Sequence, residues 1–110
     1  MDPSRVLLIE TRGPHSGPGC AAFLADGAAL AAHGSSVRVL LLGDAVTGAV
    51  ANAVPEIASL IRAGAEVAVD DISIDRRGMS HARLFPGVTR TSLEKTAAEI
   101  VDSDVKVVWH

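Results

Sequence analysis

The sequence predicts an α/β fold, in which a mostly parallel five-stranded sheet carries helices on both faces. Short apolar runs recur along the chain, and they are continuous rather than alternating, which is typical of strands covered on both faces. Helix-forming segments separate these runs, as expected for a parallel sheet. The chain has 110 residues, of which 48% are hydrophobic, so we expect one domain with a single core over residues 1–110.

The first part of the chain predicts a strand, a helix and a second strand. Residues 5–10 form the first apolar run, and residues 11–19, with three glycines and two prolines, form a loop. Residues 20–33 are rich in alanine, the best helix former, and Gly34 suits the position after a helix. Residues 37–42 predict the second strand.

The middle of the chain predicts a helix and the third strand. Residues 44–50 fit either a short helix or a loop with helical turns. Pro55 suits the first turn of a helix over residues 55–63, and the mainly apolar residues 65–69 predict the third strand.

The last part of the chain completes the predicted sheet. Residues 70–83 are polar and are expected to contain one short helix, followed by a very short strand near Val88. A helix over residues 93–102 and a strand over residues 105–109 then close the pattern.

Composition and charge exclude several classes of function. The formal net charge is −3, the basic residues are dispersed and aromatic residues make up 3% of the chain, so we expect no direct binding of nucleic acid. No apolar run approaches the length of about 20 residues that spans a bilayer, and residues 1–5 do not resemble a signal peptide. A single cysteine excludes a disulfide within the chain and favours the reducing cytoplasm. We expect no cofactor and no contact with a membrane.

The carboxyl end of the third strand is the first candidate site, because open parallel sheets bind ligands beyond the carboxyl ends of strands. The apolar run stops at Asp70, whose carboxylate at the border of the core could act as a catalytic acid or base. Alternatively, Asp70 caps the short helix that follows. Downstream, Arg76 and Arg77 could bind an anion or a second subunit, and His81 could move a proton; the simpler interpretation is a solvated surface.

Cys20 is the second candidate, because it lies at the predicted start of the first helix. Backbone N–H groups there would lower the pKa of the thiol and supply a thiolate, able to act as a nucleophile or to carry a persulfide. His15 is close enough in sequence to fold over it. The alternative is a small buried apolar residue, as free cysteines often are.

Two other kinds of site receive less support. The loop of residues 13–19 matches neither common phosphate-binding motif, so no nucleotide triphosphatase is indicated, although a helix N-terminus can still bind a small anion. His15, Cys20, Asp70 and His81 could converge above the sheet. No pair of them has the spacing of a metal site, so we expect no metal.

Several segments in a fixed order carry a family resemblance over nearly the whole chain. They include the opening strand and loop, the helix end at His33-Gly34, the strand from Gly64 to Val69 and the stretch Arg76-Arg77-Gly78-Met79. Farther along come Gly87-Val88, Ala97-Ala98-Glu99-Ile100 and Ser103-Asp104-Val105-Lys106-Val107-Val108. This layout resembles the DsrE/DsrF/TusD-like sulfur-relay family.

The resemblance implies a flavodoxin-like three-layer sandwich and a homo- or hetero-oligomer, often a dimer, trimer or hexamer. Active members of that family carry sulfur as a cysteine persulfide, for sulfur oxidation or toward tRNA thiolation, and their cysteine lies just after the third strand. In this chain Asp70 stands at the matching position. A carboxylate cannot hold a sulfane sulfur, so the group that defines the chemistry of the family is absent from its expected place.

The sequence therefore leaves three functions open. The chain could be a small DsrE-like homo-oligomer that binds a small anionic ligand or a sulfur-relay partner at the carboxyl edge of the sheet. It could be a sulfurtransferase in which Cys20 replaces the missing cysteine. Finally, it could be a non-catalytic subunit that serves assembly.

Overall fold

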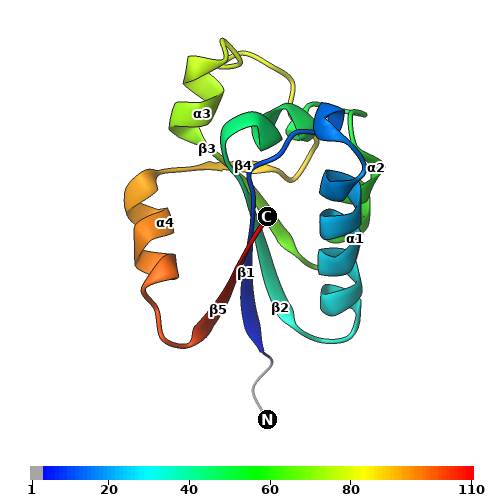
Figure 1. Ribbon diagram of the computed structural model, residues 1–110, viewed down its shortest axis with the longest axis vertical. Coiled ribbons are helices and arrows are strands. Elements are labelled where there is room, and N and C mark those ends of the chain that lie inside the picture. Colours follow the sequence, from blue (N-terminus) through cyan, green and yellow to red (C-terminus); the bar gives the residue numbers. More distant parts are fainter. Residues whose placement is uncertain (1–3) are drawn as a thin grey trace.

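The computed structural model describes residues 4–110 and has the predicted α/β architecture (Figure 1). The five strands lie in the order β4-β3-β2-β1-β5, and each pair of neighbours is parallel. The strands are β1 (Arg5–Glu10), β2 (Ser36–Leu41), β3 (Glu66–Asp70), β4 (Thr89–Thr91) and β5 (Val105–Trp109). The helices are α1 (Gly19–Ala32), α2 (Pro55–Arg62), α3 (Asp71–Arg76) and α4 (Leu93–Ile100), with 3-10 helices η1 (Pro14–Ser16) and η2 (Gly43–Ala49).

The predicted elements are confirmed, with small shifts at their ends. The third strand reaches one residue farther than expected, so Asp70 is the last residue of β3. The last helix ends at Ile100, two residues before its predicted end. The segment whose structure was left open is the 3-10 helix η2. The interpretation of residues 1–3 lies outside the described residues.

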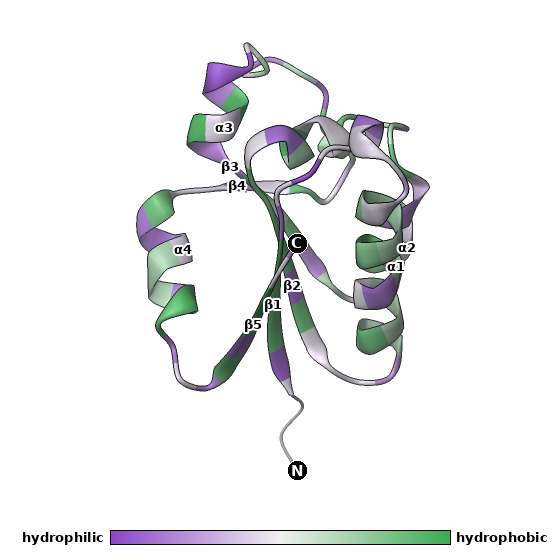
Figure 2. Ribbon diagram, viewed as in Figure 1, coloured by the Kyte–Doolittle hydropathy of each residue, from purple (hydrophilic) through white to green (hydrophobic). Residues whose placement is uncertain are grey.

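The sheet has helices on both faces, which gives the predicted three layers (Figure 1). We call the side covered by α1 and α2 the α1 face, and the side covered by α4 the α4 face. Leu8, Val39 and Val67 point into the larger core on the α1 face. The core on the α4 face is smaller and contains Leu7, Ile9, Leu40 and Ala68. Figure 2 shows hydrophobic residues along the central strands, while α3 and α4 carry both hydrophobic and hydrophilic residues.

A glycine lets α1 approach the sheet closely. A Cβ atom on Gly27 would lie 2.7 Å from Cδ1 of Leu8, a distance too short for two carbon atoms. The helix ends as predicted at Gly34, which has a φ of 100° that other residues adopt only with strain. The glycine at position 27 therefore allows tight packing on the α1 face, and Gly34 allows the turn that ends the helix.

The α4 face is more thinly covered. Its helix has 8 residues, whereas α1 has 14. Four large apolar side chains near this face are exposed. They are Ile72 of α3 (42%), Leu93 of α4 (49%), Val101 directly after α4 (81%) and Trp109 of β5 (55%). This side of the molecule thus presents apolar surface that the described residues do not cover. None of the described helices is long and apolar enough to pass through a membrane.

Candidate functional site

Buried polar residues gather where the carboxyl ends of the strands meet. Glu10 ends β1, Asp70 ends β3 and Thr91 ends β4, with exposed fractions of 0%, 2% and 5%. Side chains alternate along a strand, so Glu10 lies on the α1 face with Leu8, and Asp70 lies on the α4 face with Ala68. Two buried carboxylates therefore lie at the same edge of the sheet but on opposite faces.

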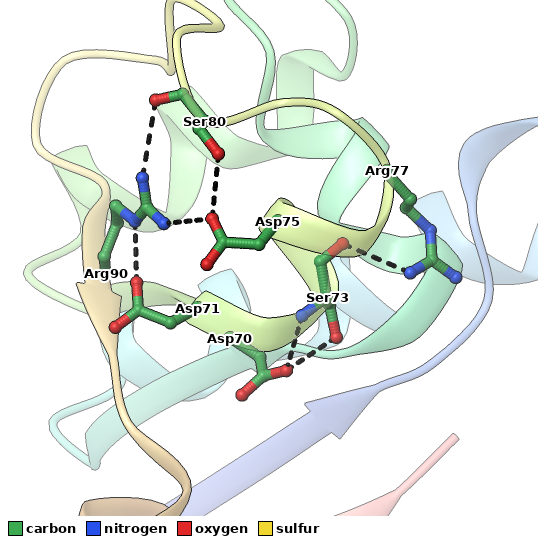
Figure 3. Close-up of polar contacts among 7 residues, drawn as sticks. All are labelled: Asp70, Asp71, Ser73, Asp75, Arg77, Ser80 and Arg90. Atoms are coloured by element: carbon green, nitrogen blue, oxygen red, sulfur yellow. Dashed lines mark hydrogen bonds and ion pairs between the residues drawn. The ribbon is translucent and has the colours of Figure 1, made fainter.

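One oxygen of Asp70 caps α3. Its Oδ2 accepts hydrogen bonds from the backbone N–H of Ser73 at 2.9 Å and from the Ser73 hydroxyl at 2.7 Å (Figure 3). The same hydroxyl oxygen accepts the N–H of Gly43 at 2.9 Å. The cap that the sequence left as an alternative is thus present, and it ties the start of η2 to the start of α3.

The other oxygen of Asp70 is unpaired. Oδ1 is buried and has no hydrogen-bond partner among the described residues. Most buried side-chain polar atoms are paired, and a buried atom left without a partner costs about 1–3 kcal/mol. Oδ1 is therefore the place in the site where a hydrogen-bond donor would be favoured.

The charged residues that follow Asp70 bind one another. Arg90, on β4, contacts Asp71 at 2.6 Å and Asp75 at 2.9 Å (Figure 3). The hydroxyl of Ser80, followed by Arg90, holds the pKa of Asp75 below its usual value. The two carboxylates, Asp71 first, raise the pKa of Arg90 above its usual value. These contacts fasten α3 and the loop after it to β4.

A second arginine fastens the other side of α3. Arg77 reaches Asp44 of η2 at 2.7 Å and also donates to the backbone oxygen of Ser73 at 3.2 Å. Arg76 is exposed and forms no ion pair within the part of the chain that the structure describes. Both neighbouring arginines are exposed, and of the two Arg77 is the one that forms an ion pair among the described residues.

Cys20 is buried, as the alternative interpretation stated. It is 2% exposed and belongs to the core on the α1 face. Burial, followed by the negative charges of Glu10 and Glu56, raises the pKa of the Cys20 thiol to about 11. The expected lowering of this pKa is therefore wrong, because burial and the two neighbouring carboxylates disfavour the thiolate. The group is a neutral thiol near pH 7.

The predicted site residues form no direct contacts with one another. His15 in η1 and His81 between α3 and β4 are exposed. No hydrogen bond or ion pair among the described residues joins any two of the five predicted site residues, Cys20, Asp70, His15, Arg76 and His81. Cys20 and Asp70 also lie on opposite faces of the sheet. The described residues hold no cluster of three or more potential metal ligands.

Sequence reasoning missed a pair of residues on the α1 face. Oε2 of the buried Glu10 lies 2.7 Å from Nδ1 of His110, the residue after β5. Oε1 accepts the N–H of Arg12 at 2.8 Å, so both carboxylate oxygens are paired. The His110 ring stacks on Phe23 of α1, with centroids 5.0 Å apart. Glu10 and His110 each lie at the end of an apolar stretch in the sequence. Only the pairing of β1 with β5 brings the two residues together.

Hollows elsewhere on the molecule lie at the opposite edge of the sheet. Two cavities of about 360 and 350 Å³ share Arg38, Glu66 and Lys95 among their lining residues. Arg38 is held there by Glu66 at 3.1 Å and by Glu99 of α4 at 2.9 Å. These cavities are near the amino ends of the strands, away from both buried carboxylates.

Comparison with known proteins agrees with this architecture. A family model described as the DsrE/DsrF-like family matches residues 4–109. The chain belongs to this family. A crystal structure of the YchN protein from E. coli is similar to this DsrE-like chain, with a TM-score of 0.87, 20% identity and 100% coverage of both chains. At that identity the likeness shows the fold alone. No curated protein sequence matches the chain.

Proposed function

We propose that this DsrE-like protein binds a small ligand or a group of a partner protein at Asp70 and does not itself carry sulfur. The observation that supports the proposal most strongly is the buried, unpaired Oδ1 of Asp70. The carboxyl ends of strands are where open parallel sheets bind ligands. Asp70 also stands where the family resemblance places the cysteine of active members.

The unpaired oxygen selects the chemistry of the ligand. An ionised carboxylate only accepts hydrogen bonds, so its partner must bring an N–H or O–H group. A charged donor, such as an ammonium or a guanidinium, forms the stronger bond. The small anion suggested by the sequence would be repelled at this atom, so we favour a ligand with a donor group.

The contacts around Asp70 are compatible with entry of a ligand. The ion pairs of Arg90 and Arg77 that hold α3 and its loop are partly exposed. Exposed ion pairs contribute about 0.2–1 kcal/mol each. On their solvent side, α3 and its loop are therefore held by weak electrostatic contacts, while Ile74 and the Ser73 cap hold α3 on its inner side.

Two observations count against sulfur transfer by this chain. The carboxylate of Asp70 offers no sulfur atom to which a sulfane sulfur could bind. Cys20 is buried, and its raised pKa leaves almost no thiolate near neutral pH, whereas the thiolate is the nucleophile. Its role as a persulfide carrier stays a prediction that can be tested directly.

Mass spectrometry after incubation with sodium polysulfide tests the absence of sulfur transfer. We expect no added sulfur on the wild-type chain and added sulfur on Asp70→Cys, which restores a thiol at the position of the family cysteine. Asp70→Ser is the matched control, since serine also caps helices but cannot hold sulfur. Added sulfur on Cys20 of the folded wild type would overturn this part of the proposal.

A titration followed by NMR tests the preferred ligand chemistry. Ethylammonium and propionate serve as probes of similar size and opposite charge. We expect ethylammonium to shift the amide signals of Ser73 and Gly43, which bond to Asp70 directly or through the Ser73 hydroxyl. The shifts should disappear in Asp70→Asn, which keeps the cap and loses the charge. Equal shifts with propionate, or none with either probe, would argue against a donor-binding site.

A role in assembly is the second candidate function, favoured by the exposed apolar residues near the α4 face. Trp109, Val101 and Leu93 are each about half exposed or more. We propose that a second copy of the chain covers this surface in a homo-oligomer. Light scattering should then give a multiple of the monomer mass, and Trp109→Glu should lower it. Arg62→Glu, an exposed change on α2, is the control. A monomer at millimolar concentration would exclude this arrangement.

Cellular location and partner proteins stay predictions. The single cysteine, unpaired and buried, is compatible with the reducing cytoplasm. A sulfur-relay protein remains the partner that the family resemblance suggests. Fractionation of cells, followed by cross-linking of the tagged full-length chain, would test both.

A further inference from the structure

The buried Glu10–His110 pair lies at the point where the order of the strands reverses. The chain runs from β1 through β2 and β3 to β4 on one side, then returns to place β5 on the other side of β1. The crevice outside the carboxyl ends of two such strands is the usual place for ligands in open α/β sheets. Glu10 ends β1 and His110 follows β5, so both residues lie at the carboxyl ends of these two strands.

The imidazole of His110 is held from three sides. Oε2 of Glu10 lies 2.7 Å from Nδ1 of His110, and Phe23 stacks on the ring with an angle of 18° between the planes. On the edge of the ring, a Cβ atom added to Gly19 would lie 3.0 Å from Cε1. Glycine thus leaves room for the ring against the start of α1. A side chain with so few available orientations presents its remaining nitrogen in a fixed direction.

The contact with Glu10 determines which nitrogen is free. In the neutral ring, Nδ1 carries the proton that Glu10 accepts, and Nε2 keeps a lone pair. Nε2 has no hydrogen-bond partner among residues 4–110, and the side chain is 33% exposed. A purely structural contact would need only the Nδ1–H donor. A reachable, oriented lone pair next to a buried carboxylate is the arrangement of a general base.

We propose that Glu10 and His110 form a second site, separate from Asp70, in which Nε2 of His110 accepts the proton of a small hydroxyl or thiol compound. The O–H or S–H proton passes to Nε2, and its electron pair stays on the oxygen or sulfur atom of the ligand. The resulting imidazolium is stabilised by the Glu10 carboxylate at Nδ1. When the ligand leaves, the proton returns to it, so the step needs no other reactant. Glu10 is the positioning residue, because it acts through the imidazole.

The tautomer of His110 gives a test that needs no variant. Long-range ¹⁵N–¹H NMR spectra at a pH where the ring is neutral should show a proton on Nδ1 and none on Nε2. The exposed His15 and His81 provide internal comparisons that lack the carboxylate contact. A proton on Nε2 of His110, or exchange between both tautomers as in the exposed rings, would overturn the proposal.

Binding of 4-nitrophenol tests the acceptance of a proton, because its absorbance changes when it becomes the phenolate. At a pH where the His110 ring is neutral and part of the free 4-nitrophenol is still protonated, the wild-type chain should increase the phenolate band and shift the NMR signals of Gly19 and Phe23. 4-Nitroanisole, which lacks the O–H group, should do neither. Equal binding of both compounds, or no increase in the phenolate band, would overturn the proposal.

Two matched variants distinguish the direct contact of Glu10 with His110 from the effect of removing any nearby negative charge. Glu10→Gln keeps the shape and an acceptor for Nδ1–H but loses the charge that stabilises the imidazolium, so binding of 4-nitrophenol should weaken roughly tenfold. Glu56→Gln removes a nearby charge that does not contact His110, and its binding should equal that of the wild type. An equal loss in both variants would overturn the role of Glu10. If Glu10→Gln does not fold, the tautomer of the wild type still decides.

Discussion

Glu10 and Asp70 occupy equivalent places on opposite faces of the sheet, yet their surroundings differ. Each ends a central strand and is almost fully buried. Both oxygens of Glu10 have hydrogen-bond partners. One partner is the His110 side chain, whose second ring nitrogen is free to bind another molecule. Asp70 uses one oxygen for a cap and leaves the other unpaired. A buried carboxylate can thus contribute to a binding site in two ways. It can orient a second side chain, or it can accept a hydrogen bond from the ligand itself.

The layers that cover the two carboxylates differ in the same way. On the α1 face, a helix packs so closely that Gly27 cannot gain a Cβ atom without a shift of Leu8. Asp70 instead caps a short helix, and partly exposed ion pairs join that helix to β4. The close packing on the α1 face favours a rigid, oriented group at Glu10. The weaker contacts near Asp70 favour a site in which nearby segments can move. The following predictions test this contrast, from the largest effect to the smallest.

Loss of Glu10 should destabilise the protein most. Glu10→Ala leaves the N–H of Arg12 and Nδ1–H of His110 without their acceptor in a buried place, so we expect a loss of about 3 kcal/mol in the free energy of unfolding. Urea denaturation measures it. Glu56→Ala is the control, and a similar small loss for both variants would contradict the importance of the buried pair.

Alkaline pH should lower the stability of the fold because of the buried Cys20 thiol on the α1 face. The thiol has a pKa of about 11 when folded and 9.0 as its reference value. Between these values the unfolded chain has released the proton and the folded chain still holds it, so stability falls as pH rises from 9 to 11. The expected loss is about 2–3 kcal/mol. Cys20→Ala should flatten this dependence in denaturation curves, and an unchanged slope would exclude Cys20 as its source.

Changes at Asp70 should cost less than changes at Glu10. Asp70→Ala removes the cap, which costs about 1 kcal/mol, and also removes the unpaired oxygen, which offsets part of that loss. Asp70→Asn keeps a capping oxygen and should stay within about 0.5 kcal/mol of the wild type. Thermal denaturation of the two variants measures the difference. A loss as large as that of Glu10→Ala would remove the contrast between the faces.

Arg90 should contribute least to stability. Its two ion pairs are partly exposed, so Arg90→Gln should lower the free energy of unfolding by at most about 1 kcal/mol, and by less in concentrated salt. Hydrogen exchange should nevertheless become faster in α3, because Arg90 joins that helix to β4. If exchange in α3 is unchanged, these ion pairs do not hold the cover over Asp70.

Much of the fold could be predicted because its signals are local. Continuous apolar runs predicted the buried parallel strands, and Gly34 marked the end of the first helix. The site was harder. The burial of Cys20 depends on how α1 packs on the sheet, which its position near the start of a helix does not reveal. The meeting of Glu10 and His110 depends on β5 pairing with β1, a contact between residues nearly a whole chain apart that no local pattern encodes.

The hydroxyl of Ser73 has a practical consequence for experiments on this protein. It accepts the N–H of Gly43 and donates to Asp70. The amide of Gly43 is therefore linked to the carboxylate through one O–H group, and its NMR signal should respond when the carboxylate binds a ligand. Gly43 follows β2 and lies outside the helix that Asp70 caps. One glycine signal, in a region of the NMR spectrum where glycines stand apart, can therefore report binding at the proposed Asp70 site during a ligand screen without any label on the ligand.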